Sequence, residues 1–148
     1  MIPVNRKFLL ADDDADDANL FCEALAGIGS TIECHTAENG LELFELLSRH
    51  DTYKPDIIFL DINMPIMNGW DCLKKLKDSS NYKNIPIIMY STSSAKKDIE
   101  MAYSLGALLF LKKPVDFREL SNILEVVATS PGDSLLSRLK AFQSVKVN

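Results

Sequence analysis

Long hydrophobic runs are missing from this sequence, and histidine is scarce. No apolar run approaches the roughly 18 residues that a membrane-spanning helix needs. The two histidines, His35 and His50, lie far apart, so neither a zinc site nor a histidine-based catalytic triad is expected. The apolar stretch that follows the basic start is too short for a signal peptide. We therefore expect a cytoplasmic protein that does not bind membranes.

Cysteine is also scarce. The three cysteines, Cys22, Cys34 and Cys72, are odd in number and form no Cys-x-x-Cys pair. We interpret them as small core or half-buried thiols in a reducing compartment. A chain of 148 residues buries roughly two-thirds of its unfolded surface, so it needs no disulfide or structural metal to hold its fold together.

Excess positive charge is absent as well. The chain has 16 Lys and Arg against 21 Asp and Glu, a net charge of -5. A surface of that sign repels phosphate backbones, so nucleic acid is not an expected partner. Apolar residues at 47% and charged residues at 25% exclude a disordered or collagen-like chain and indicate one globular domain.

Five short apolar segments alternate with five segments in which apolar residues recur at helical spacing. The expected strands are 8–11, 31–36, 57–60, 85–90 and 107–111. Several of these strands are apolar throughout, which is typical of a parallel sheet covered on both faces. Right-handed crossovers then favour an α/β, flavodoxin-like, doubly wound sheet with strand order 2-1-3-4-5 and helices on both faces.

Functional groups in such sheets lie where the strands end. The first expected strand ends in Asp12 and Asp13, the third in Asp61, the fourth in Ser91 and the fifth in Lys113. Converging carboxylates repel one another unless a cation lies between them, and oxygen-only ligands favour Mg²⁺. A carboxylate beside Mg²⁺ and a lysine can act as a nucleophile toward phosphorus.

Three more aspartates, Asp14, Asp16 and Asp17, follow the first strand. They open the first helix, where an aspartate cap and an acidic first turn interact favourably with the helix dipole. We expect them to stabilise the helix start, and metal binding is the less favoured alternative.

The chain from about residue 7 to 129 resembles the receiver domain of two-component response regulators. The residues that carry this resemblance are Asp12-Asp13, the run from Phe59 to Gly69, Ser91-Thr92 and Lys113-Pro114. The Asp-x-Asn-Met-Pro-x-Met-x-Gly pattern together with a correctly spaced Lys-Pro is specific to that family. The long stretch 77–84 is similar to stand-alone receivers whose partners are phytochrome-like or other hybrid kinases.

The resemblance implies a role for each matching acidic residue. Asp61 is similar to the aspartate that accepts a phosphoryl group from a sensor histidine kinase. Asp13 would bind Mg²⁺ directly, and Asp12 would help directly or through water. The backbone carbonyl of Asn63 would complete the ligands from the protein.

The same resemblance assigns the remaining positions. Ser91 matches the switch hydroxyl and Phe110 the switch aromatic. Lys113 matches the lysine that pairs with the phosphoryl oxygens, and its bond to Pro114 is expected to be cis. Thr92 stands where the family often has alanine or glycine, so access to the phosphoryl group would be tighter.

Other classes of function fit less well. An aspartate-nucleophile phosphatase of the haloacid dehalogenase type needs a second aspartate where this chain has Asn63. A flavin-binding module on this fold needs a hydroxyl- or glycine-rich loop, whereas the aspartates after the first strand repel an anionic cofactor. Among receivers, an end effector and a relay intermediate that passes its phosphoryl group to a histidine phosphotransfer protein both stay open. A monomer and a phosphorylation-dependent dimer also stay open.

Residues 1–129 are the expected receiver domain, and 130–148 are expected to form a tail without an output domain. Pro131 and Gly132 end the last receiver helix. Asp133 or Ser134 then offers a cap for a short helix with an apolar face of Leu135, Leu136, Leu139 and Phe142. Docking on the chain's own domain is favoured over contact with a partner or a second copy.

Overall fold

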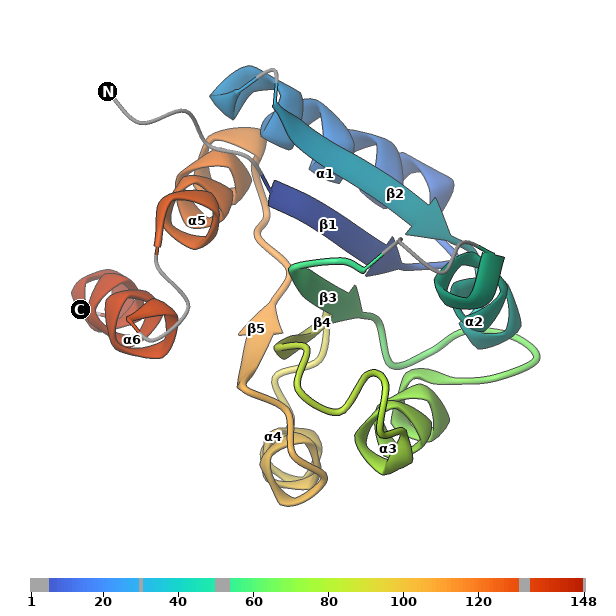
Figure 1. Cartoon of the computed structure of the whole chain (residues 1–148). Helices are drawn as coiled ribbons and strands as arrows, with labels where there is room; N and C mark the ends of the chain where they lie inside the picture. The colour runs from blue at the N-terminus through green and yellow to red at the C-terminus, as the bar shows by residue number, and fades with distance from the viewer. Residues whose placement is uncertain (1–5, 30, 50–53, 131–133, 148) are drawn as a thin grey trace.

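A computed structural model describes residues 6–29, 31–49, 54–130 and 134–147, with side chains described as far as residue 141 (Figure 1). The strands are β1 (Arg6–Ala11), β2 (Ile32–Ala37), β3 (Ile57–Leu60), β4 (Ile87–Ser91) and β5 (Leu109–Lys112). The helices are α1 (Ala15–Ile28), α2 (Gly40–Arg49), α3 (Gly69–Asp78), α4 (Lys96–Ser104), α5 (Phe117–Thr129) and α6 (Leu135–Val147). None of the described helices has the length and apolar character that crossing a membrane requires.

The five strands form one parallel sheet in the order β2-β1-β3-β4-β5, which confirms the expected doubly wound topology. Side chains alternate between the two faces of a strand, so each strand contributes to two separate cores. In β1, Phe8 and Leu10 pack in the core under α1, α5 and α6, whereas Leu9 and Ala11 pack in the core under α2, α3 and α4. Figure 1 shows these two helical layers on either side of the sheet.

An aromatic cluster lies at the centre of the first core. Phe21 of α1 packs edge-on against Phe59 of β3 with their ring centroids 4.9 Å apart, and Phe59 meets Tyr90 of β4 at 5.8 Å. Such edge-to-face pairs stabilise by about 0.5–1.5 kcal/mol beyond their burial. The cluster therefore fixes α1 against the ends of β3 and β4.

The tail forms helix α6, which packs on α5. Leu135 and Leu139 are buried in the core under α1 and α5. Arg138 Nη1 donates a hydrogen bond to the Thr129 carbonyl at 3.2 Å, and Arg6 Nη2 donates to the Ser130 carbonyl at 2.6 Å. Because α5 has no basic residue in its own last turn, these two arginines supply positive charge at its carboxyl end.

The first part of the tail is only partly described. Asp133, one of the two residues expected to cap α6, lies outside the described residues. The side chain of Phe142, expected on the apolar face of the tail helix, lies outside them as well.

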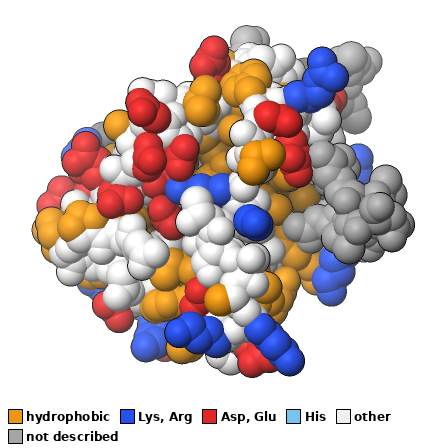
Figure 2. All heavy atoms as spheres, turned by 180° about the vertical axis from the view of Figure 1, so that it is seen from behind, with side chains coloured by type: hydrophobic (Ala, Val, Ile, Leu, Met, Phe, Trp, Pro, Cys, Tyr) orange, Lys and Arg blue, Asp and Glu red, His pale blue; other side chains and the backbone are white. Residues whose placement is uncertain are grey.

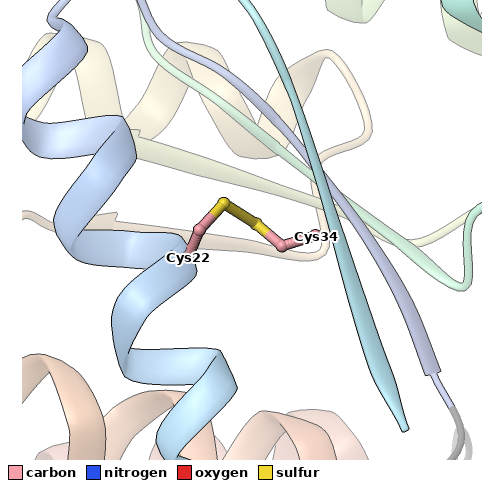
Figure 3. Close-up of a disulfide and its surroundings, with 2 residues drawn as sticks. All are labelled: Cys22 and Cys34. Carbon is pink, nitrogen blue, oxygen red and sulfur yellow. A yellow bond between two sulfur atoms is a disulfide. The ribbon is translucent and has the colours of Figure 1, made fainter. Parts of the chain in front are cut away.

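The expectation of three unpaired cysteines is wrong for two of them. Cys22 on α1 and Cys34 on β2 form a disulfide, with their Cα atoms 5.6 Å apart (Figure 3). Their spacing along the chain carries no disulfide signal, because the two residues meet only when α1 packs beside β2. Cys72 on α3 is a free, buried cysteine, as expected. Burial raises the pKa of its thiol to about 11.

Candidate functional site

Acidic residues meet where β1 and β3 end. Ala11 pairs with Leu60 in the sheet, so the residues that follow them begin at the same level. The backbone N–H of Asp12 donates to the Ala37 carbonyl and that of Asp61 to the Ala11 carbonyl, each at 2.9 Å. Both carboxylates are thus held by backbone that continues the sheet, and both are buried.

The acidic cluster of Asp12, Asp13 and Asp61 fits a divalent cation. Each residue offers a carboxylate oxygen, and these oxygens lie within 4.8 Å of one another. Asp12 Oδ2 is buried and, apart from an ion pair with Lys113, has no hydrogen-bond donor among the described residues. Burial raises the pKa of Asp12 to about 6, although Lys113 opposes that shift. An incompletely compensated carboxylate beside two others is the type of oxygen site that Mg²⁺ binds.

Lys113 from the end of β5 contacts three carboxylates at once. Its Nζ lies 2.8 Å from Asp12 Oδ2, 2.9 Å from Asp17 Oδ2 and 3.2 Å from Asp61 Oδ2. Burial lowers the pKa of this ammonium, but the bonds to Asp12 and Asp17 and the charge of Asp61 outweigh it, so the pKa is raised above its ordinary value. The lysine therefore stays charged. It also lies 5.6 Å from the ring centroid of Tyr90.

Asp17 is the site residue that the sequence analysis missed. Asp14 caps α1 as expected, since its Oδ1 accepts from the backbone N–H groups of Asp16 and Asp17 at 3.0 and 3.1 Å. Asp17 also reaches Lys113, which is 96 residues away along the chain. An acidic residue in a first helical turn is sufficiently explained by the helix dipole, so the sequence held no separate signal for this second contact.

The candidate switch residues lie on the neighbouring strands β4 and β5. Ser91 is buried; its Oγ accepts from the Ser93 N–H at 3.1 Å, and its carbonyl accepts from the Lys113 N–H at 2.7 Å. Phe110 is buried in the core under α2, α3 and α4. Thr92, directly after Ser91, is exposed. The backbone bond from Lys113 thus joins the lysine directly to the end of β4.

The expected cis bond between Lys113 and Pro114 is wrong, because every peptide bond among the described residues is trans. The trans form of an X–Pro bond is favoured by roughly 0.5–1 kcal/mol before any tertiary contact is made. With this bond trans, the Lys113 N–H donates to the Ser91 carbonyl and the ammonium contacts the Asp61 carboxylate.

The segment after Asp61 is built around a close backbone approach. Asn68 caps α3, where its Oδ1 accepts from the Asp71 N–H at 2.9 Å. The Gly69 N–H donates to the Ile62 carbonyl at 2.8 Å. A Cβ on Gly69 would overlap the carbonyl oxygen of Asp61 and lie 2.9 Å from the Cα of Ile62, so only glycine fits there. Asn63, whose carbonyl is a candidate ligand, lies exposed in this segment, two residues after Asp61.

The surface around the site combines acid and apolar groups. On the face drawn in Figure 2, acidic side chains gather in the upper left part, with basic and hydrophobic side chains beside them. Three hydrophobic residues of the α1 and β5–α5 region are exposed: Leu20, Val115 and Phe117. They line a cavity of about 130 Å³ together with Asp17 and Lys113. The lysine therefore has open space on the side of Asp17.

The chain is similar to known proteins over most of its length. The sequence profile described as "Response regulator receiver domain" matches residues 8–125. The chemotaxis protein CheY1 of Helicobacter pylori is 34% identical over 121 residues, which cover 82% of this chain and 95% of that protein.

Solved structures agree with this similarity. The phosphorylated cyanobacterial phytochrome response regulator RcpA has a TM-score of 0.75 at 30% identity, covering 82% of this chain and 89% of its own. The Mn²⁺-bound form of response regulator Rcp1 has a TM-score of 0.71 at 26% identity, covering 82% of this chain and 91% of its own.

Proposed function

Because the chain belongs to the response regulator receiver domain family, we propose that it is a phosphoryl-accepting switch of a two-component system with Asp61 as the acceptor. One observation carries this proposal. The Asp61 carboxylate lies 3.2 Å from the ammonium of Lys113 and shares an oxygen cluster with Asp12 and Asp13. A nucleophilic carboxylate, a fixed cation and a second cation site are the parts that phosphoryl transfer needs.

The proposed donor is a phosphohistidine of a sensor histidine kinase or a hybrid kinase. A carboxylate oxygen of Asp61 attacks phosphorus; the new O–P bond forms as the N–P bond breaks, and its electron pair stays on the imidazole nitrogen. Asp61 becomes an acyl phosphate. Lys113 needs only a short movement to pair with the phosphoryl oxygens, because it already contacts the acceptor.

The carboxylates of Asp12, Asp13 and Asp61, with the backbone carbonyl of Asn63, would hold Mg²⁺. When bound, the ion offsets the negative charge of the transferring phosphoryl group. The buried Oδ2 of Asp12 supports this assignment, because it has an ion pair with Lys113 but accepts no hydrogen bond among the described residues. A solved response regulator of similar structure is described as Mn²⁺-bound, which supports divalent-cation binding by this type of domain.

The proposed switch joins the phosphoryl group to a protein-interaction surface. The Ser91 hydroxyl would turn toward the phosphoryl group, and Phe110 would turn inward into the space that it vacates. These two movements would alter the surface formed by α4, β5 and α5. Ser91 is suited to this role because it ends β4 and accepts the backbone hydrogen bond of Lys113. Onward transfer to a histidine phosphotransfer protein is the alternative output. We place the protein in the cytoplasm, where such kinases present their phosphohistidine.

The direct test is labelling by a small phosphodonor in the presence of Mg²⁺. We expect intact-mass spectra to show one added phosphate, and no addition when EDTA is present from the start of the reaction. Asp61→Asn should abolish the addition, whereas Asp71→Asn, an exposed aspartate in the first turn of α3, should keep it. Labelling that persists in Asp61→Asn would contradict the assignment.

A further inference from the structure

The ammonium of Lys113 contacts three carboxylates, which belong to three different parts of the fold. An ammonium has three protons, so each carboxylate can accept one of them. Asp12 follows β1, Asp61 follows β3, and Asp17 lies in the first turn of α1. Asp17 lies closer to the ammonium than Asp61 does, at 2.9 Å against 3.2 Å. The unphosphorylated lysine is therefore held more closely on the α1 side than by the acceptor.

A closed ring of contacts fixes Asp17 in this position. The backbone N–H of Asp14 donates to Asp12 Oδ1 at 3.0 Å, and Asp14 Oδ1 accepts from the Asp17 N–H. Lys113 then joins the carboxylates of Asp17 and Asp12 and completes the ring. Because the capping bond already orders the backbone of Asp17, little further entropy is lost when its side chain pairs with the lysine.

We propose that Asp17 is a positioning residue that draws the Lys113 ammonium toward α1 and away from Asp61. The cavity shared by Asp17 and Lys113 leaves room for the lysine on that side. The Asp61 carboxylate is then less engaged by the ammonium and more available for attack on phosphorus, because it lies farther from the ammonium than Asp12 and Asp17 do. This inference rests on the proposed function of Asp61.

The test compares Asp17→Asn with Asp16→Asn in the full chain. Both changes remove one negative charge from the same helical turn, so they affect the approach of an anionic donor similarly, but Asp16 is exposed and does not pair with Lys113. With Asp17 neutral, Lys113 should settle on Asp61. We expect the maximal rate of self-phosphorylation to be about fivefold lower in Asp17→Asn than in Asp16→Asn. The half-saturating donor concentrations should be similar, and Asp17→Glu should restore part of the rate.

A second measurement does not depend on phosphorylation. Nitrogen-15 NMR of lysine ammonium groups should show a slowly exchanging Lys113 signal in the wild type and in Asp16→Asn, identified by its absence in Lys113→Gln. That signal should broaden or vanish in Asp17→Asn. Equal maximal rates in the two aspartate variants, or an unchanged ammonium signal in Asp17→Asn, would overturn the proposal. A wild type that takes up no phosphate would overturn the proposed function instead, while the ammonium signal still tests Asp17.

Discussion

At the residue scale, Gly69 holds the backbone of the acceptor in place. Replacing it with alanine puts a methyl group into the carbonyl oxygen of Asp61, and backbone on both sides leaves no flexible group to yield. We expect Gly69→Ala to lower the free energy of unfolding by about 3 kcal/mol, the upper range for overpacking a well-packed site. Urea denaturation followed by circular dichroism measures the change.

Gly27→Ala is the matched control for this substitution. Apart from its chain neighbours and the nearby backbone of α1, no described atom lies within 4 Å of a Cβ added at Gly27, which is inside that helix. Alanine is the better helix former, so this change should raise the free energy of unfolding by about 0.5–1 kcal/mol. Equal stability of the Gly69 and Gly27 variants would show that the Asp61 backbone yields easily.

The sequence predicts the position of a residue well where that residue directly follows a strand. Asp12, Asp13, Asp61 and Lys113 were expected on one edge of the sheet, and the structure brings them together. Asp17 could not be predicted, because its contact depends on how the first turn of α1 is oriented toward the end of β5. No local pattern encodes that orientation.

At the element scale, the disulfide ties α1 to β2 and leaves a single thiol. The denatured but unreduced protein should therefore give one thiol in a reaction with an aromatic disulfide reagent, from Cys72. After reduction it should give three. In the native protein Cys72 should react slowly at pH 8, because it is buried and burial raises the pKa of its thiol to about 11.

The variant Cys22→Ser is the control for this thiol titration. Cys22→Ser leaves Cys34 without a partner, so the denatured, unreduced variant should give two thiols. Three thiols in the unreduced wild type would contradict the pairing and would restore the expectation of free cysteines.

The elements themselves could be predicted because their signals are local. Apolar runs mark β3 and β4 as buried on both faces, and Gly106 marks the end of α4. The Cys22–Cys34 bond and the trans peptide before Pro114 could not be predicted in the same way. Both depend on how separate elements meet. For the peptide bond before Pro114, the family resemblance predicted the cis isomer.

At the scale of the whole molecule, α6 shares a core with α1 and α5. Leu139 is fully buried there, so Leu139→Ala should lower the free energy of unfolding by about 2–4 kcal/mol in a single cooperative transition. Lys140→Ala, an exposed neighbour in the same helix, should change it by less than about 0.5 kcal/mol. Thermal and urea unfolding of the full chain measure both.

Phosphorylation provides an independent control for these two variants. Leu139 lies in the core that α6 shares with α1 and α5, so labelling of folded Leu139→Ala should match that of wild type. A Leu139→Ala protein as stable as Lys140→Ala would show that α6 contributes nothing to the fold.

With a divalent ion bound, Asp12 and Asp61 would each contact two cations, since both belong to the oxygen cluster with Asp13 and to the ion pairs of Lys113. The divalent ion and the ammonium would then be antagonists, and each would weaken the binding of the other by the same coupling free energy. The reciprocity is thermodynamic, so it needs no movement of the sheet. The Lys113 N–H donates to the Ser91 carbonyl, so a shift of Lys113 on ion binding would reach the end of β4 through this hydrogen bond.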